Sequence, residues 1–138
     1  MADFISKDRR SEIMRSIRAS NTKPELLVRS VLHRLGYRFR LHRKDLPGTP
    51  DIVLPGHRVV IFVHGCFWHG CEKCDKGTRI PKTNTEFWRE KIERNRERDR
   101  QAIANLASTS WRVMIVWQCE TSDVQKLASR LQVFLSNR

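Results

Sequence analysis

The chain has 138 residues, a length that suits one domain with its own hydrophobic core. Lysine and arginine number 27 against 15 aspartate and glutamate residues, which gives a formal net charge of +12. This excess favours a polyanionic partner, nucleic acid rather than membrane, although a generic basic surface has the same composition. With no signal peptide and no run of ~18 apolar residues, we expect a cytoplasmic, nucleoid-associated protein without membrane contact.

Two helices are predicted at the start of the chain. The first spans Lys7–Ala19. The sequence Thr22-Lys23-Pro24-Glu25 is typical of a capping box with a proline in the first turn, and it begins a second helix that runs to Leu35 and ends before Gly36. The apolar residues expected on the buried side of this second helix are Leu26, Leu27, Val31 and Leu32.

Three strands are predicted after these helices. Residues Tyr37–Leu41 alternate apolar and basic side chains, as a half-exposed strand does. Asp51–Leu54 begins a buried strand, Pro55-Gly56 turns the chain, and Val59–Val63 returns as a strongly apolar strand. We therefore expect Asp51 to lie beside the last of these strands.

The second half of the chain predicts a long helix, a strand and a final helix. The helix spans Asn84 to Ala107, the strand covers Arg112–Trp117, and Thr121 or Ser122 is expected to cap the last helix. The order of elements predicts one α/β domain, residues 1–138, in which helices flank a mixed β-sheet.

The four cysteines are predicted to bind a structural zinc ion. Cys66, Cys71 and Cys74 form a C-x4-C-x2-C loop, and Cys119 follows the predicted strand 112–117. In a reducing compartment such cysteines indicate metal ligands before disulfides, and four thiolates leave no open position for catalysis. The alternatives are four buried or free thiols, or a site in which a histidine replaces one cysteine.

Asp51 is a candidate ligand of a catalytic magnesium ion. It follows a proline and opens an apolar strand, and Mg²⁺ prefers oxygen ligands, but a simple turn aspartate has the same pattern. His64 ends the neighbouring strand and His69 lies five residues further on. A neutral imidazole can accept a proton from water or donate a hydrogen bond to a phosphate.

Asp99 is expected to have a buried partner. It belongs to a stripe on the long helix that recurs at helical spacing, and a carboxylate on such a face is costly unless it is paired. The partner is either an imidazole that it orients as a general base or a neighbouring arginine. The stripe consists of Trp88, Ile92, Asn95, Asp99 and Ile103.

Other residues have two interpretations each. Glu25 either completes the helix cap, which the sequence favours, or contacts a metal-bound water. Phe67 and Trp68 either stack on bases or pack beneath the cysteine loop. Met14 and Trp88 are similarly divided between the core and DNA.

Three segments, residues 48–53, 62–69 and 85–92, resemble the very-short-patch-repair endonuclease family. The run His-Gly-Cys-Phe-Trp-His at residues 64–69 is the most specific part of this resemblance. Residues 97–100 and 111–119 extend it, and Met14-Arg15 with Thr22–Glu25 adds the N-terminal part, so it covers nearly the whole chain.

The resemblance implies a restriction-endonuclease-like fold and a Mg²⁺-dependent DNA endonuclease. Its substrate would be double-stranded DNA with a T·G mismatch left by deamination of 5-methylcytosine, nicked on one strand 5′ to the mismatched T. Other repair proteins are candidate partners, and we expect a monomer. Two competing hypotheses are a zinc-stapled module that binds DNA without cutting it, and a relative that cuts intact duplex at a specific sequence.

The resemblance also implies roles for single residues. Asp51 and the backbone carbonyl of Val63 would bind Mg²⁺, and His69 would be the general base, oriented by Asp99. His64 would support the phosphate and Glu25 a metal-bound water. Zinc would be bound by Cys66, Cys71, Cys74 and Cys119, and DNA by Met14 on an N-terminal helix (residues 1–20) and by the wedges Phe67, Trp68 and Trp88.

The sequence departs from the family pattern at two positions. Cys71 stands where other members have a histidine, and an all-cysteine site remains good zinc chemistry. Val63 replaces a hydroxyl residue, which leaves a carbonyl ligand unchanged. Like the family, the chain lacks the acidic and lysine pair of restriction-type nucleases and has Phe62 and His64 there. This favours His69 as the base.

Overall fold

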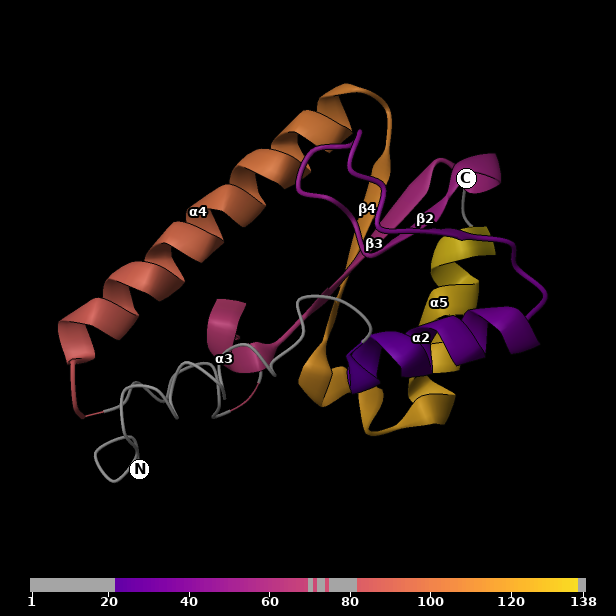
Figure 1. The fold of residues 1–138 in the computed structure, drawn as a ribbon. Coiled ribbons are helices and arrows are strands. Elements are labelled where there is room, and N and C mark those ends of the chain that lie inside the picture. Colours follow the sequence, from indigo (N-terminus) through magenta and orange to yellow (C-terminus); the bar gives the residue numbers. More distant parts are fainter. Residues whose placement is uncertain (1–21, 70, 72–73, 75–81, 137–138) are drawn as a thin grey trace.

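The computed structural model describes residues 22–69, 71, 74 and 82–136 (Figure 1). The predicted helix Lys7–Ala19, with Met14, lies outside the described residues, as do the side chains of Phe67 and Trp68. Within the described part of the chain, no helix is both long and apolar enough to span a membrane.

Four strands form one mixed sheet in the order β1 (Arg40–Leu41), β2 (Ile52–Leu54), β3 (Val59–His64) and β4 (Arg112–Trp117). β2 pairs antiparallel with both β1 and β3, whereas β3 and β4 are parallel. A parallel pair needs a crossover connection, and here it includes the helix α4 (Thr85–Ser108). The predicted mixed α/β sheet is therefore confirmed.

Helices cover both faces of the sheet (Figure 1). One face packs against α2 (Lys23–Arg34) and α5 (Val124–Ser136), and the other packs against α4. Side chains alternate along β3, so that Val59 and Ile61 join the first core while Val60 and Phe62 join the second. A short helix, α3 (Cys66–His69), follows β3 directly.

Sequence patterns located α4 and the cap of α2 correctly. Asn84 directly precedes α4, as predicted. The predicted stripe along α4 faces inward: Ile92 is buried, and the other members are partly buried, namely Trp88, Asn95, Asp99 and Ile103. The Thr22 hydroxyl accepts a hydrogen bond from the Glu25 backbone N–H at 3.4 Å, as a helix cap does.

Three local predictions were wrong. Residues 37–41 pair with β2 only at Arg40–Leu41. Leu26 is 48% exposed, because the inner face of α2 is set by Val28 with Val31 and Leu32. Neither Thr121 nor Ser122 caps α5; Asp123 Oδ1 accepts from the Lys126 backbone N–H at 3.1 Å, while both hydroxyls donate to carbonyls of the 3₁₀ turn η4 (Gln118–Thr121).

The loop before β2 depends on a glycine. Gly48 has φ +76°, and a Cβ built there would lie 2.7 Å from the Ala102 Cβ on α4 and 3.1 Å from the Phe62 ring. The backbone therefore approaches α4 more closely than any larger residue allows.

We predict that Gly48→Ala destabilises the protein by about 2–4 kcal/mol, because overpacking adds to an unfavourable left-handed conformation. Gly56→Ala is the matched control, since its Cβ would meet nothing within 4 Å. Urea unfolding at constant m-value measures both variants. Equal midpoints for Gly48→Ala and the control would contradict the predicted clash.

Candidate active site and metal centre

Asp51 lies at the point where β2 begins, beside β3. Its Oδ2 accepts a hydrogen bond from the Val63 backbone N–H at 2.7 Å, so the predicted proximity of Asp51 to β3 is confirmed. Burial raises the pKa of Asp51 from 3.8 to about 6, although the Val63 hydrogen bond opposes this shift. A partly buried carboxylate with a raised pKa is typical of a functional site.

His69 and Asp99 meet between α3 and the middle of α4. His69 Nδ1 lies 2.7 Å from Asp99 Oδ2, so the partner predicted for Asp99 is an imidazole, although both side chains are partly rather than fully buried. His64 Nε2 lies 3.8 Å from the other carboxylate oxygen of Asp99. The rings of His64 and His69 stack, with centroids 3.9 Å apart and planes inclined by 5°. One carboxylate and one stacked ring thus fix the orientation of His69.

His64 is held as a neutral side chain. Burial, followed by the proximity of His69, lowers the pKa of His64 from 6.5 to about 4. Its Nδ1 is buried and has no hydrogen-bond partner among the described residues. The rings of His64 and Trp117 pack in a T-shaped arrangement, with centroids 5.2 Å apart. At neutral pH His64 therefore adds a polar but uncharged wall to the site.

Glu25 contributes to the same region as Asp51. It is 1% exposed, and its Oε1 lies 2.5 Å from His42 Nε2 and 3.3 Å from an Arg29 guanidinium nitrogen. Ligand atoms of Glu25, His42 and Asp51 all lie within 4.8 Å of one another. Glu25 therefore does more than a capping residue, because its carboxylate contacts His42 and lies close to that of Asp51.

Sequence reasoning missed His42. It belongs to no recognised motif, and it occupies a surface-like stretch of alternating basic residues. Its place in the site depends on a left-handed backbone conformation, φ +47°, that nothing in the local sequence indicates. Histidine is one of the few non-glycine residues enriched in that conformation.

Asp51 interacts electrostatically both with the pair Glu25 and His42 and with His69. His42 and His69 both lower the pKa of Asp51, whereas Glu25 raises it. His69 and Asp51 therefore lie close enough to interact, as the sequence interpretation required. The arrangement sets carboxylates able to hold a divalent cation beside an imidazole able to accept a proton.

The four cysteines converge into a second centre. Their sulfur atoms all lie within 4.8 Å of one another, and the Sγ atoms of Cys71 and Cys119 are 3.8 Å apart. Four thiolates ~2.3 Å from a tetrahedral zinc ion are separated by about 3.8 Å, so the spacing fits zinc. The Cys119 backbone N–H donates to Cys66 Sγ at 3.4 Å, which further supports a thiolate there.

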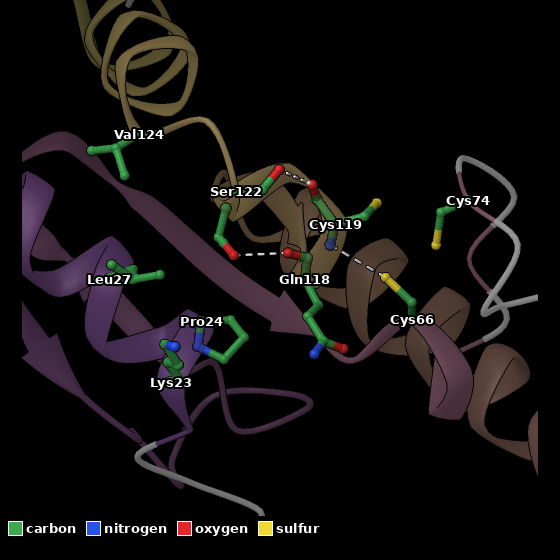
Figure 2. A pocket seen from close by; sticks show the side chains of 10 residues that line it. Lys23, Pro24, Leu27, Cys66, Cys74, Gln118, Cys119, Ser122 and Val124 are labelled. Carbon is green, nitrogen blue, oxygen red and sulfur yellow. Dashed lines mark hydrogen bonds between the residues drawn. The ribbon is translucent and has the colours of Figure 1, made fainter.

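The histidines do not belong to this centre, because His64 and His69 gather around Asp99 instead. Burial and the neighbouring sulfur atoms raise the pKa of the Cys66 and Cys119 thiols. A bound cation compensates such crowded thiolates. Figure 2 shows Cys66, Cys74 and Cys119 along one side of a cleft whose other side is the start of α2.

We predict about one zinc ion per chain, and Cys119→Ser is expected to lose most of it, because thiolate ligands supply the binding energy. Elemental analysis of the purified chain measures the ratio. Asp51→Ala is the control and should retain the zinc. Wild-type protein without zinc but with four thiols reactive toward a thiol reagent would refute the centre.

Of the residues predicted to wedge between bases, the structure describes the side chain of Trp88 only. Trp88 is partly buried on α4 and packs edge-on against Phe87, with ring centroids 5.1 Å apart. Phe87 is 52% exposed, a large surface ring that sequence reasoning did not single out. Phe67 and Trp68 belong to α3, but their side chains, like Met14, lie outside the described residues, so the wedge role stays a prediction.

Comparisons with known proteins agree on one family. Residues 2–76 match the family model described as DNA mismatch endonuclease Vsr. The chain is 56% identical to the type II nicking enzyme V.XorIIP of Xanthomonas oryzae pv. oryzae, with 98% of each chain covered. It is 46% identical to the DNA mismatch endonuclease Vsr of Escherichia coli, over 92% of this chain and 80% of that protein.

A further relative and a solved structure extend the comparison. The type II nicking enzyme V.NmeAIP of Neisseria meningitidis is 44% identical, over 95% of this chain and 92% of the relative. The catalytic domain of the homing endonuclease I-Bth0305I has a similar fold, with a TM-score of 0.58 and 21% identity, covering 83% of this chain and 94% of that one.

Fold, site and comparisons together define the class of the protein, which is a DNA-nicking endonuclease. Within that class, the chain belongs to the Vsr DNA mismatch endonuclease family.

Proposed function

We propose that this endonuclease nicks one strand of DNA 5′ to the T of a T·G mismatch that arises when 5-methylcytosine deaminates, and so initiates very-short-patch repair. The observation that carries the proposal is the pair formed by His69 and Asp99, 2.7 Å apart, beside the partly buried carboxylate of Asp51. A binding module without chemistry has no need of an oriented imidazole next to a buried acid.

His69 is the general base in this proposal. Asp99 accepts a hydrogen bond from the Nδ1–H of His69, which leaves Nε2 as the acceptor that can take a proton from the attacking water. The stacked, neutral ring of His64 restricts the rotation of His69 and offers a hydrogen bond to the phosphate.

Asp51 and the Val63 carbonyl are the proposed ligands of a Mg²⁺ ion, and Glu25 orients a water molecule at that ion. Their oxygen atoms are the ligand type that Mg²⁺ prefers. When bound, Mg²⁺ would neutralise charge on the scissile phosphate. The four-cysteine zinc centre has no open position, and its role here is to hold α3 and η4 in place around the site.

Recognition of the mismatch is assigned to aromatic wedges on a basic surface. The net charge of +12 supplies phosphate binding without sequence preference. Phe67 and Trp68, with Trp88 and Met14, are the rings and thioether proposed to separate the base pairs at the mismatch. The protein would act as a monomer on nucleoid DNA in the cytoplasm, with other repair proteins completing repair.

Labelled duplexes test the substrate assignment directly. We expect Mg²⁺-dependent nicking of a T·G duplex on the T strand alone, and at least about tenfold slower nicking of the matched T·A duplex, since separating a paired, stacked step costs a few kcal/mol more. Denaturing gels measure both rates across varied flanking sequences. Equal rates on both duplexes would instead support a sequence-specific nicking enzyme, a possibility raised by the names of the type II nicking relatives.

Removing the proposed magnesium ligand should separate cutting from binding. We predict that Asp51→Ala lowers the nicking rate by on the order of 10³-fold, because metal coordination stabilises the transition state by several kcal/mol. DNA affinity without added Mg²⁺, measured by fluorescence anisotropy, should change little. Asp45→Ala is the matched control, because its exposed carboxylate pairs with the neighbouring Arg43. Wild-type nicking by Asp51→Ala would refute the assignment.

A further inference from the structure

His42 contacts both acidic residues of the candidate site, Asp51 through its backbone and Glu25 through its side chain. It follows β1 directly, next to the last pair of the β1–β2 ladder, Leu41 with Ile52. Its backbone N–H donates to the Asp51 carbonyl oxygen at 3.1 Å. The left-handed conformation of His42 turns the chain out of the ladder at this point. The backbone of Asp51 is therefore anchored by the same residue whose side chain reaches Glu25.

The imidazole of His42 has a defined hydrogen-bonding role. Its Nε2 lies 2.5 Å from Glu25 Oε1 and 3.4 Å from an Arg29 guanidinium nitrogen. A carboxylate oxygen only accepts, so the shorter contact requires Nε2 to carry a proton and donate it to Glu25; with that proton in place, the donor-only guanidinium of Arg29 makes no hydrogen bond to Nε2. Glu25 is almost fully buried, so this bond and the Arg29 contact at 3.3 Å fix its carboxylate.

His42 also lies close to two groups that repel each other. Two carboxylates whose oxygen atoms lie within 4.8 Å of each other oppose joint ionisation. A ring nitrogen of His42 lies within 4.8 Å of an oxygen of each carboxylate, so the imidazole is placed to hold Glu25 next to Asp51. A structural ion pair alone would need Glu25, Arg29 and His42, but it would not need His42 to face Asp51.

We propose that His42 is a positioning residue of the active site, which fixes Glu25 through its imidazole and Asp51 through its backbone so that both carboxylates face one divalent cation. This proposal rests on the proposed function, in which Asp51 and Glu25 serve the catalytic ion. Partners outside the metal ligands typically change metal affinity or activity 10- to 100-fold. His42 extends the site to the loop after β1, which no sequence motif marks.

Three variants of the full, zinc-loaded chain test this role. His42→Ala removes the donor to Glu25, His42→Gln keeps an amide N–H that can reach the same oxygen, and His33→Ala is the control, an exposed histidine near the end of α2. Mn²⁺ binding to the protein without DNA is measured by electron paramagnetic resonance. The Mg²⁺ concentration for half-maximal nicking, DNA affinity without added Mg²⁺, and the thermal midpoint are measured in parallel.

We expect His42→Ala to weaken Mn²⁺ binding and raise the half-saturating Mg²⁺ concentration about tenfold or more, with DNA affinity unchanged. His42→Gln should remain within about threefold of wild type, because the hydrogen bond is rescued. A fold defect would lower the folded fraction without changing the half-saturating Mg²⁺ concentration. If His42→Ala does not fold, the Gln variant decides alone.

Two results would overturn the proposal: unchanged Mn²⁺ and Mg²⁺ dependence in a folded His42→Ala, or a folded His42→Gln that loses tenfold or more in metal affinity. Failure of the proposed function has a different outcome. If Asp51 is not the metal ligand, Asp51→Ala and the wild type will bind Mn²⁺ equally. If the mismatch is irrelevant, the Mg²⁺ dependence can still be compared on whichever duplex is nicked.

Discussion

The hydrogen bond from the Val63 N–H to the Asp51 carboxylate is the contact on which the site depends. It ties the start of β2 to the end of β3 and satisfies a partly buried carboxylate that apolar packing alone would destabilise. Because β3 continues straight into His64 and α3, the same strand end also delivers His69 toward Asp99 on α4. One short stretch of backbone, residues 63–69, thus carries the N–H that binds Asp51 and the imidazoles of His64 and His69.

The parallel pairing of β3 and β4 explains why the cysteine centre lies beside these residues. In the register, His64 pairs with Trp117, and Cys66 and Cys119 each follow two residues later. Parallel strands end at the same edge of a sheet, so these two cysteines meet without any distortion of the chain. The centre then fixes α3 against η4, and the orientation of α3 determines where His69 lies. The four cysteines and the imidazoles of His64 and His69 therefore lie at the same edge of the sheet, where β3 and β4 end.

Sequence reasoning was most successful where a local pattern reports directly on the environment. The stripe on α4 located Asp99 on an inward face, and the cysteine spacing indicated one cluster without histidine as its first interpretation. It failed where the answer depends on distant partners. The exposure of Leu26 follows from how α2 packs on α5, and the role of His42 follows from a left-handed residue opposite Asp51. Neither leaves a periodic or compositional trace in the sequence.

The site opposes the stability of the fold that holds it. A carboxylate whose pKa is raised by folding favours the protonated form, so stability falls as the pH rises from about 4 to about 6 and Asp51 ionises. At neutral pH the cost is on the order of 3 kcal/mol, since each pKa unit corresponds to about 1.4 kcal/mol. Glu25 adds to this cost, and His42 and His69 offset part of it. A ligand that binds only the folded state stabilises it. A divalent cation bound by these carboxylates would therefore offset the destabilisation that they cause in the metal-free protein. The residues that compensate the buried acids are therefore also those that keep them ready for metal.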